Sequence, residues 1–196
     1  LVKAASPCVL WIDEIERGLS GGESSGKTDG GTTDRMIGTL LNWMQEKTKP
    51  VFVFATSNDV SNLPPQLLRA GRFDKLWFAD LPNQTEREEI WSIMLRRTKR
   101  DPKKYDLKEL AAATDGWSGS EIEALWNDAL TDAFAASDNP KDPHTVEVLG
   151  LSKSRKPLSE TSAAKIENMR KWAEAQASPA TTPIKKKSKQ SVRALN

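Results

Sequence analysis

The sequence predicts an α/β protein in which a parallel β-sheet is followed by a small helical subdomain. Two observations support the sheet: short, almost wholly apolar runs at 8–12 and 51–55, and a predicted helix between them. Strands joined through a helix pair in parallel, and parallel strands are typically apolar along their whole length. A third observation separates the subdomain, because every periodic segment after Pro82 has the spacing of a helix.

The helix between the two strands is expected near residues 33–46, where apolar residues repeat at helical spacing. The residues of this apolar face are Met36, Ile37, Leu40, Leu41 and Met44. A shorter apolar run at 76–79 predicts a third parallel strand. The first 80 residues therefore contain most of the predicted sheet.

The helices predicted beyond Pro82 cover residues 85–97, 106–113, 118–134 and 159–177. Capping boxes at Thr85–Glu88 and Ser118–Glu121 indicate where two of them begin. Residues 137–157 are polar, carry three prolines and the single histidine, His144, and are predicted to form a solvated loop or linker.

Basic residues concentrate in the last segment, 178–196, which is rich in Ser, Thr, Pro and Lys and is expected to be disordered. This segment has five basic and no acidic residues, whereas the whole chain has a net charge of +2. Residues 1–177 therefore carry a net charge of −3. Most basic tails only increase solubility, and we do not expect a nucleic-acid partner. No apolar run reaches the ~18 residues of a membrane span. A single cysteine excludes an internal disulfide and fits a reducing compartment.

The first strand ends in two carboxylates, Asp13 and Glu14. Ligands of open α/β sheets bind beyond the carboxyl ends of the strands, so both residues lie at the binding edge. In P-loop NTPases an aspartate at this place helps to hold Mg²⁺. A neighbouring glutamate can orient and polarise the attacking water. The alternative is an acidic helix start that the helix dipole favours without any catalytic role.

Further motifs follow the second strand and extend into the helical part. They are Thr56-Ser57-Asn58, Leu63-Pro64-Pro65-Gln66-Leu67-Leu68-Arg69, Gly71-Arg72-Phe73-Asp74, Leu81-Pro82-Asn83 and Gly116-Trp117-Ser118-Gly119-Ser120-Glu121-Ile122. Together with the acidic strand end, they resemble the AAA clade of the AAA+ ATPases over about residues 5–135. Pro157-Leu158-Ser159 adds a narrower resemblance to plastid- and cyanobacterial-type single-domain AAA proteins.

The resemblance implies ATP and Mg²⁺ as cofactors and assigns roles at the strand ends. Asp13 would serve the Mg²⁺ ion, and Glu14 would position the hydrolytic water. Asn58 would be the sensor that hydrogen-bonds the water or the γ-phosphate.

The resemblance also implies a homo-oligomer, a hexameric ring in most such proteins. Arg69 and Arg72 would be arginine fingers that act on the ATP of the neighbouring subunit. Gly119 and Ser120 would pack near the adenine. The alternative for each arginine is a surface salt bridge.

Residues 21–28 satisfy the pattern G-x-x-x-x-G-K-[ST], yet their context differs from that of a phosphate-binding loop. Such a loop follows a strand directly and opens a helix whose N-terminus faces the phosphates. Here residues 13–20 intervene, and Asp29-Gly30-Gly31 comes after Thr28. We interpret the segment as a flexible loop at the place of a second pore-facing loop. The chain, whose first residue is Leu1, is expected to be a fragment without the Walker A loop and inactive alone.

The implied architecture has three parts. Residues 1–84 form an incomplete P-loop NTPase-like parallel sheet, whose N-terminal half is missing. Residues 85–177 form a helical lid, and residues 178–196 form the basic tail. The implied function is ATP hydrolysis coupled to remodelling of a protein substrate, in the cytoplasm or plastid stroma. Two alternatives stay open: a nucleic-acid-associated AAA+ protein that uses its tail, and a non-enzymatic module that docks onto intact subunits.

Overall fold

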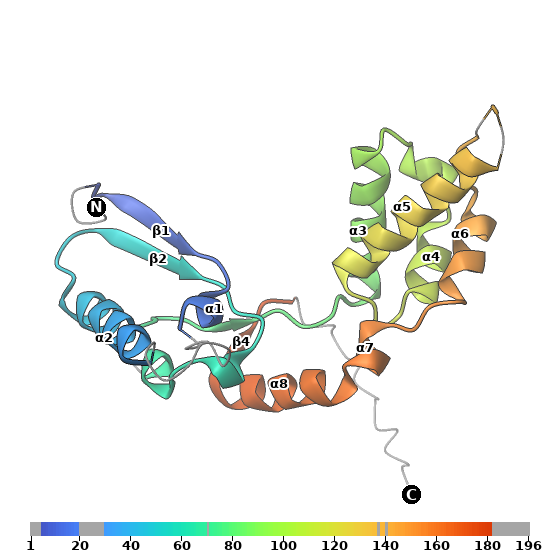
Figure 1. The fold of residues 1–196 in the computed structure, drawn as a ribbon. Helices are drawn as coiled ribbons and strands as arrows, with labels where there is room; N and C mark the ends of the chain where they lie inside the picture. The colour runs from blue at the N-terminus through green and yellow to red at the C-terminus, as the bar shows by residue number, and fades with distance from the viewer. Residues whose placement is uncertain (1–4, 20–29, 70, 137, 140, 182–196) are drawn as a thin grey trace, which may run out of the picture. The chain divides into compact units, whose positions relative to one another are not determined.

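The structure is a computed structural model, and it describes residues 5–19, 30–69, 71–136, 138–139 and 141–181 (Figure 1). The chain divides into two compact units, Leu1–Leu76 and Trp77–Asn196. Each unit is described by itself. The loop at 21–28 and most of the basic tail lie outside the described residues.

The first unit contains two strands that pair in parallel, β1 (Cys8–Ile12) and β2 (Val51–Ala55). Their register runs from Cys8 opposite Val51 to Ile12 opposite Ala55. Helix α1 (Ile15–Leu19) follows β1, and helix α2 (Gly30–Glu46) precedes β2. The 3₁₀ helices η1 (Val60–Asn62) and η2 (Pro65–Leu68) follow β2. The predicted parallel pairing across a helical connection is therefore confirmed.

One face of this sheet packs against the helices, and a small core forms there. Its buried side chains are Ile15, Leu19, Leu41, Met44 and Leu67. The other face exposes Val9 and Trp11 of β1 and Phe52 and Phe54 of β2. Successive side chains of a strand point to opposite faces. The described residues therefore cover one face of the sheet and leave the apolar side chains of the other face exposed. Met36, predicted on the inner face of α2, is also exposed.

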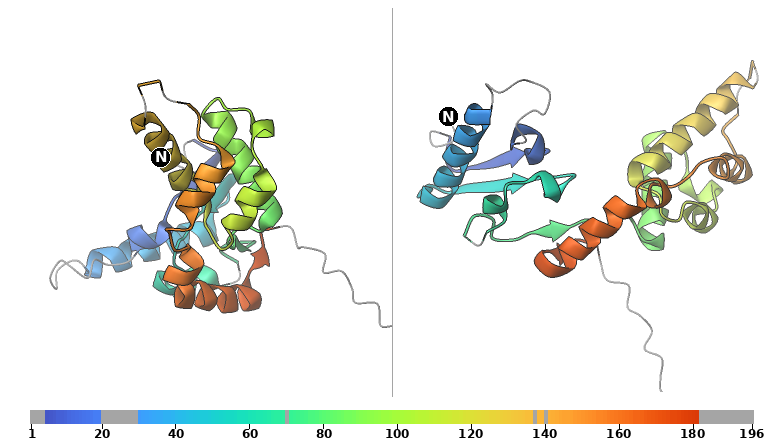
Figure 2. Two further views of the ribbon diagram at one scale, coloured as in Figure 1. Left: turned by 90° about the vertical axis from the view of Figure 1, so that its right-hand side faces the viewer. Right: turned by 60° about the horizontal axis from the view of Figure 1, so that its bottom comes forward.

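The second unit consists mainly of helices. They are α3 (Gln84–Arg97), η3 (Pro102–Lys104), α4 (Leu107–Ala113), α5 (Gly119–Ala135), α6 (Thr145–Ser152), α7 (Leu158–Thr161) and α8 (Ala163–Gln176). Figures 1 and 2 show α3, α4, α5 and α6 gathered side by side. The core between them is rich in tryptophan, and it includes Trp91, Leu95, Leu110, Ile122, Leu125, Trp126 and Val148.

Helix starts in this unit follow their capping residues. The predicted Ser118–Glu121 capping box is present at the start of α5, and Asp106 caps α4. For α3 the prediction is wrong by two residues. The cap is Asn83, whose side chain accepts from the Glu86 amide, while the Glu86 carboxylate accepts from the Asn83 amide at 2.9 Å. An asparagine caps a helix as well as a threonine does.

Helix α6 lies inside residues 137–157, which were predicted to form a loop. Val148 is fully buried and packs into the core of the helical unit. The exposed His144 precedes the helix, and its backbone amide donates to the Glu147 carboxylate at 2.6 Å. The helix is stabilised by packing against α4 and α5. Its apolar residues repeat over too few positions for the helix to be recognised from the sequence.

The end of the described chain also differs from the prediction. The helix expected over 159–177 is interrupted at Ser162, between α7 and α8. Beyond α8, β4 (Ser178–Pro179) pairs in parallel with β3 (Trp77–Phe78). Residues 178–179 are therefore ordered, and β3 belongs to a separate two-stranded sheet. Arg170 of α8 supports this arrangement with a bidentate ion pair to Asp80.

Candidate functional site

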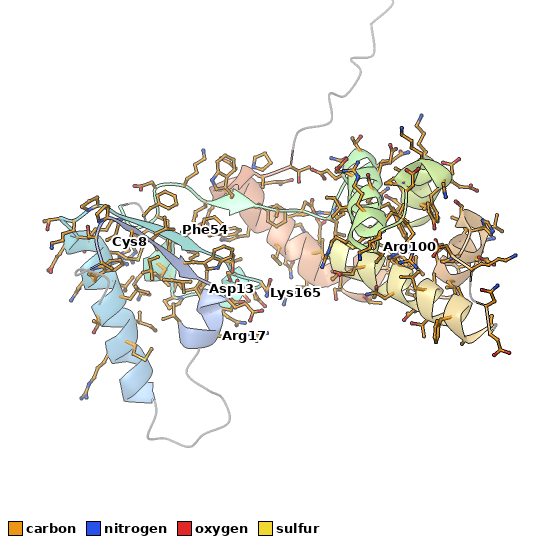
Figure 3. The ribbon with its side chains drawn as sticks, turned by 90° about the horizontal axis from the view of Figure 1, so that it is seen from above. Cys8, Asp13, Arg17, Phe54, Arg100 and Lys165 are labelled. Atoms are coloured by element: carbon orange, nitrogen blue, oxygen red, sulfur yellow. The ribbon has the colours of Figure 1, made fainter. Side chains whose placement is uncertain are left out.

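The carboxyl ends of β1 and β2 lie side by side, because the strands are parallel and pair up to Ile12 and Ala55. The Thr56 amide donates to the Ile12 carbonyl at 3.0 Å, and the Ile15 amide donates to the Thr56 carbonyl at 2.9 Å. Figure 3 labels Asp13 at this end of β1. The register therefore brings the acidic residues after β1 next to the polar residues after β2.

Thr56 links the two strand ends through its hydroxyl group. Its Oγ1 donates to the carboxylate of Asp13 and accepts from the Glu14 amide at 3.0 Å. Glu14 has a φ of 47°, in the left-handed region that costs a non-glycine residue about 1–2 kcal/mol. Such conformations persist where the surroundings hold them, and the bond to Thr56 does so here. Sequence reasoning gave Thr56 no role, although it begins the Thr-x-Asn motif.

The Glu14 carboxylate is held at both oxygens. Asn58 Nδ2 donates to Oε1 at 2.8 Å, and Arg17 Nε lies 2.7 Å from Oε2. The Glu14 side chain is 29% exposed, whereas the Arg17 side chain is 77% exposed. The structure thus brings Glu14 and Asn58, both of which were expected to act on the hydrolytic water, into direct contact. Arg17 is an additional partner that the sequence did not indicate.

Glu16 is a second acidic residue of the site that sequence reasoning missed. It is only 6% exposed, and its Oε1 accepts from the Asn58 amide at 2.9 Å. Burial would raise the pKa of this carboxyl. Hydrogen bonds from the Asn58 amide, its own amide and the Ser57 hydroxyl, with the charge of Arg17, instead hold the pKa below its ordinary value. Its Oε2 is buried and has no hydrogen-bond partner among the described residues.

The donor set at the strand ends fits magnesium. Asp13 is exposed, and the structure shows one of its carboxylate oxygens bonded to Thr56. Within the described ranges, no cluster of three or more acidic, His or Cys side chains could enclose a metal ion. Mg²⁺ needs no such cluster, because it is commonly bound by one or two carboxylates together with water and substrate phosphates. Asp13 is therefore suited to hold it.

The two candidate arginine fingers lie in the segment after η2. Arg69 is exposed, and its amide donates to the Gln66 carbonyl at 3.4 Å. Arg72 is half-buried, and its guanidinium donates to the same carbonyl. In the part of the chain that the structure describes, neither guanidinium has an ion-pair contact with Asp13 or Glu14.

Gly119 and Ser120 belong to the helical unit and form the start of α5. The Ser120 hydroxyl lies 3.1 Å from that of Ser118, the capping residue. A side chain at Gly119 would meet Ile90 of α3 at ordinary contact distance. Their predicted place near an adenine therefore stays a prediction.

The fold is that of an α/β segment of the P-loop NTPase type followed by a helical lid. A family model for "ATPase family associated with various cellular activities (AAA)" matches residues 1–81, and an AAA+ lid domain model matches residues 104–145. The chain belongs to the AAA clade of the AAA+ ATPases, as the motifs predicted.

Curated relatives support the narrower resemblance as well. The "Uncharacterized AAA domain-containing protein ycf46" of Pyropia yezoensis is 41% identical over 169 residues, which cover 86% of this chain and 33% of that protein. Its namesake from Guillardia theta is 42% identical over 173 residues, or 87% and 33%. The peroxisomal ATPase pex1 of Schizosaccharomyces pombe is 35% identical over 127 residues, which cover 64% and 13%. The chain thus spans about a third of the ycf46 relatives.

Among solved structures, the FIGL-1 AAA domain in complex with ADP superposes with a TM-score of 0.67 at 20% identity, covering 88% of this chain and 59% of that one. This likeness shows the fold. No helix of the described residues is both long and apolar enough to cross a membrane.

Proposed function

We propose that this chain supplies the magnesium-holding, water-orienting and subunit-edge parts of an ATPase. The contact between Glu14 Oε1 and Asn58 Nδ2, 2.8 Å at the carboxyl ends of two parallel strands, carries the proposal. It places a carboxylate and an amide donor together where open α/β sheets bind their ligands. The fold neighbour FIGL-1 was solved with ADP, which supports a nucleotide as the ligand.

Each residue at the strand ends has a distinct task in this proposal. Asp13, oriented by the Thr56 hydroxyl, would hold Mg²⁺. When bound, this ion neutralises negative charge on the phosphates. Glu14 would accept a hydrogen bond from the attacking water and polarise it. Asn58 would keep the Glu14 carboxylate in place through Oε1 and offer its amide to the water or γ-phosphate. The water would take the place of Arg17 at Oε2.

The ring is the second part of the proposal. Arg69 is exposed, and Arg72 lies on the same segment. An arginine supplied to a neighbour's ATP stabilises charge that develops in the transition state, and it is worth ~10³–10⁵ in rate. We propose that Arg69 and Arg72 act in this way in a homo-hexamer, and that Gly119 and Ser120 pack near the adenine. The hexamer would remodel a protein substrate in the cytoplasm or plastid stroma. Residues 1–196 alone would be inactive.

Substitution of Glu14 tests the catalytic assignment. In the intact protein, Glu14→Gln should bind ATP as the wild type does but hydrolyse it ~10²–10⁴-fold more slowly, because the amide keeps the shape and loses the base. Glu46→Gln, at an exposed position at the end of α2, is the matched control and should leave the rate unchanged. Hydrolysis by Glu14→Gln at near the wild-type rate would remove Glu14 from its role.

Mixed rings test the arginines. One variant lacks the guanidinium groups of Arg69 and Arg72, and the other carries Glu14→Gln. Each should be nearly inactive, and mixing should restore part of the activity, because some intact Glu14 sites gain a neighbour with intact arginines. Sizing must first show that both variants assemble. If rings form and mixing restores nothing, the arginines do not act between subunits.

A further inference from the structure

Glu16 is a buried carboxylate that the proposed chemistry does not use. It is 6% exposed, lies on α1, and points one oxygen at the Asn58 amide, 2.9 Å away. Its other oxygen is buried without a hydrogen-bond partner among the described residues. Burying a charge is costly unless its interactions repay the lost hydration. A valine or leucine would fill the same space without this cost, so the carboxylate calls for an explanation beyond packing.

The hydrogen bonds of α1 show what the carboxylate does. The Ile15 amide of α1 binds the Thr56 carbonyl at 2.9 Å, and Glu16 binds the amide of Asn58. The main chain from 56 to 58 is therefore attached to α1 at both ends. A bond from a backbone amide to a charged acceptor is about twice as strong as one between neutral groups.

Fixing the main chain at Asn58 also fixes its side chain. Asn58 is itself exposed, and few surrounding atoms restrict where its amide group points. Its Nδ2 nevertheless lies 2.8 Å from Glu14 Oε1. Asn58 contacts Glu16 through its main-chain amide and Glu14 through its side chain. Loss of the contact with Glu16 would therefore let the side-chain amide of Asn58 move away from Glu14. Displacements of about 1 Å at reacting groups can lower rates ~10²-fold.

We infer that Glu16 is a positioning residue for ATP hydrolysis: its carboxylate holds the main chain at Asn58 so that the Asn58 side chain meets Glu14. The inference rests on the proposed function of Glu14 and Asn58. Glu16 touches neither nucleotide nor water in this scheme, and it acts through Asn58 alone.

The test compares Glu16→Ala and Glu16→Gln in the intact protein, each alone and combined with Asn58→Ala. Glu16→Ala should lower kcat about tenfold or more and change KM little, because Glu16 itself touches neither nucleotide nor water. Glu16→Gln keeps a neutral acceptor for the Asn58 amide and should show an intermediate loss. In the Asn58→Ala background, Glu16→Ala should cause no further loss. Losses that multiply in the double variant would show that Glu16 acts independently of Asn58 and overturn the inference.

Hydrogen exchange provides a readout that does not depend on turnover. Glu16→Ala should increase exchange at the Asn58 amide at least tenfold, while amides within β2 stay protected. Unchanged protection of the Asn58 amide would overturn the inference even if activity falls. Should Glu16→Ala fail to fold, the same measurements on Glu16→Gln should show the same direction at smaller size, and unchanged exchange there would equally overturn it.

The outcomes also separate this inference from the proposed function. If Glu14→Gln hydrolyses ATP normally, the proposed function fails, and the exchange data still decide whether Glu16 anchors Asn58. If Glu14→Gln is inactive while Glu16→Ala is fully active, only the positioning role fails.

Discussion

Gly116 should not tolerate a side chain, because two features of the structure oppose one. Its φ is +74°, and a Cβ built on it would overlap Ser159 at the start of α7, lying 2.9 Å from the Ser159 Cβ. Rotation of the serine hydroxyl cannot relieve contact with Cβ. The main chains are also joined, since the Ser159 amide donates to the Gly116 carbonyl at 3.2 Å.

The cost of Gly116→Ala follows from these two features. The left-handed backbone costs alanine about 1–2 kcal/mol. The overlap with Ser159 costs about 1–3 kcal/mol as local overpacking. Alanine restricts the unfolded chain and so offsets about 0.4–1 kcal/mol. The helical unit should therefore lose about 1–5 kcal/mol, and at ~4–8 °C per kcal/mol its melting temperature should fall by at least ~4 °C.

Thermal unfolding followed by far-ultraviolet circular dichroism would measure this loss. Adding Ser159→Gly should recover the overlap part, about 1–3 kcal/mol, and leave the backbone part. Gly150→Ala, in α6 with open space around it, is the control and should be neutral or stabilise by about 0.5–1 kcal/mol. A Gly116→Ala protein that melts like the wild type, or one that Ser159→Gly does not rescue, would refute this contact.

Val148→Ala should destabilise the helical unit by about 1–3 kcal/mol, because the side chain is fully buried; an unchanged urea midpoint would contradict the packing of α6. Residues 1–196 alone should bind no Mg-ATP at micromolar affinity in calorimetry, since their only phosphate-loop pattern, 21–28, does not follow a strand. In the intact protein, Lys27→Ala should keep hydrolysis within a few-fold of the wild type; lost nucleotide binding would instead identify 21–28 as the phosphate loop.

That the residues after β1 and β2 lie together could be predicted, because this depends only on strand pairing. Two apolar runs joined through a helix are parallel neighbours, and residues that follow their carboxyl ends then lie together. The partners of Arg17 and Glu16 could not be predicted in this way. They depend on the left-handed turn at Glu14, which sets the direction of α1, and no residue pattern indicates a positive φ at a glutamate.

Short elements that are held by tertiary contacts also could not be predicted from the sequence. Helix α6 has eight residues, follows a histidine rather than a preferred capping residue, and lies after prolines. Strand β4 has two residues and exists only through its pairing with β3. Local propensity is weak in such segments, and packing against the rest of the unit decides their structure. The longer α5 was predicted because its capping box and apolar repeat agree.

Burial indicates which partner Glu14 gives up when water binds. The pair with Arg17 joins residues three apart, and the arginine is 77% exposed. Exposed ion pairs of this kind contribute about 0–1 kcal/mol, so water can displace Arg17 at small cost. The contact with Asn58 is different, because the Asn58 main chain is bound by the buried carboxylate of Glu16. Glu14 should therefore exchange its exposed partner and keep Asn58, which leaves the carboxylate oriented while its Oε2 becomes free to accept from the water.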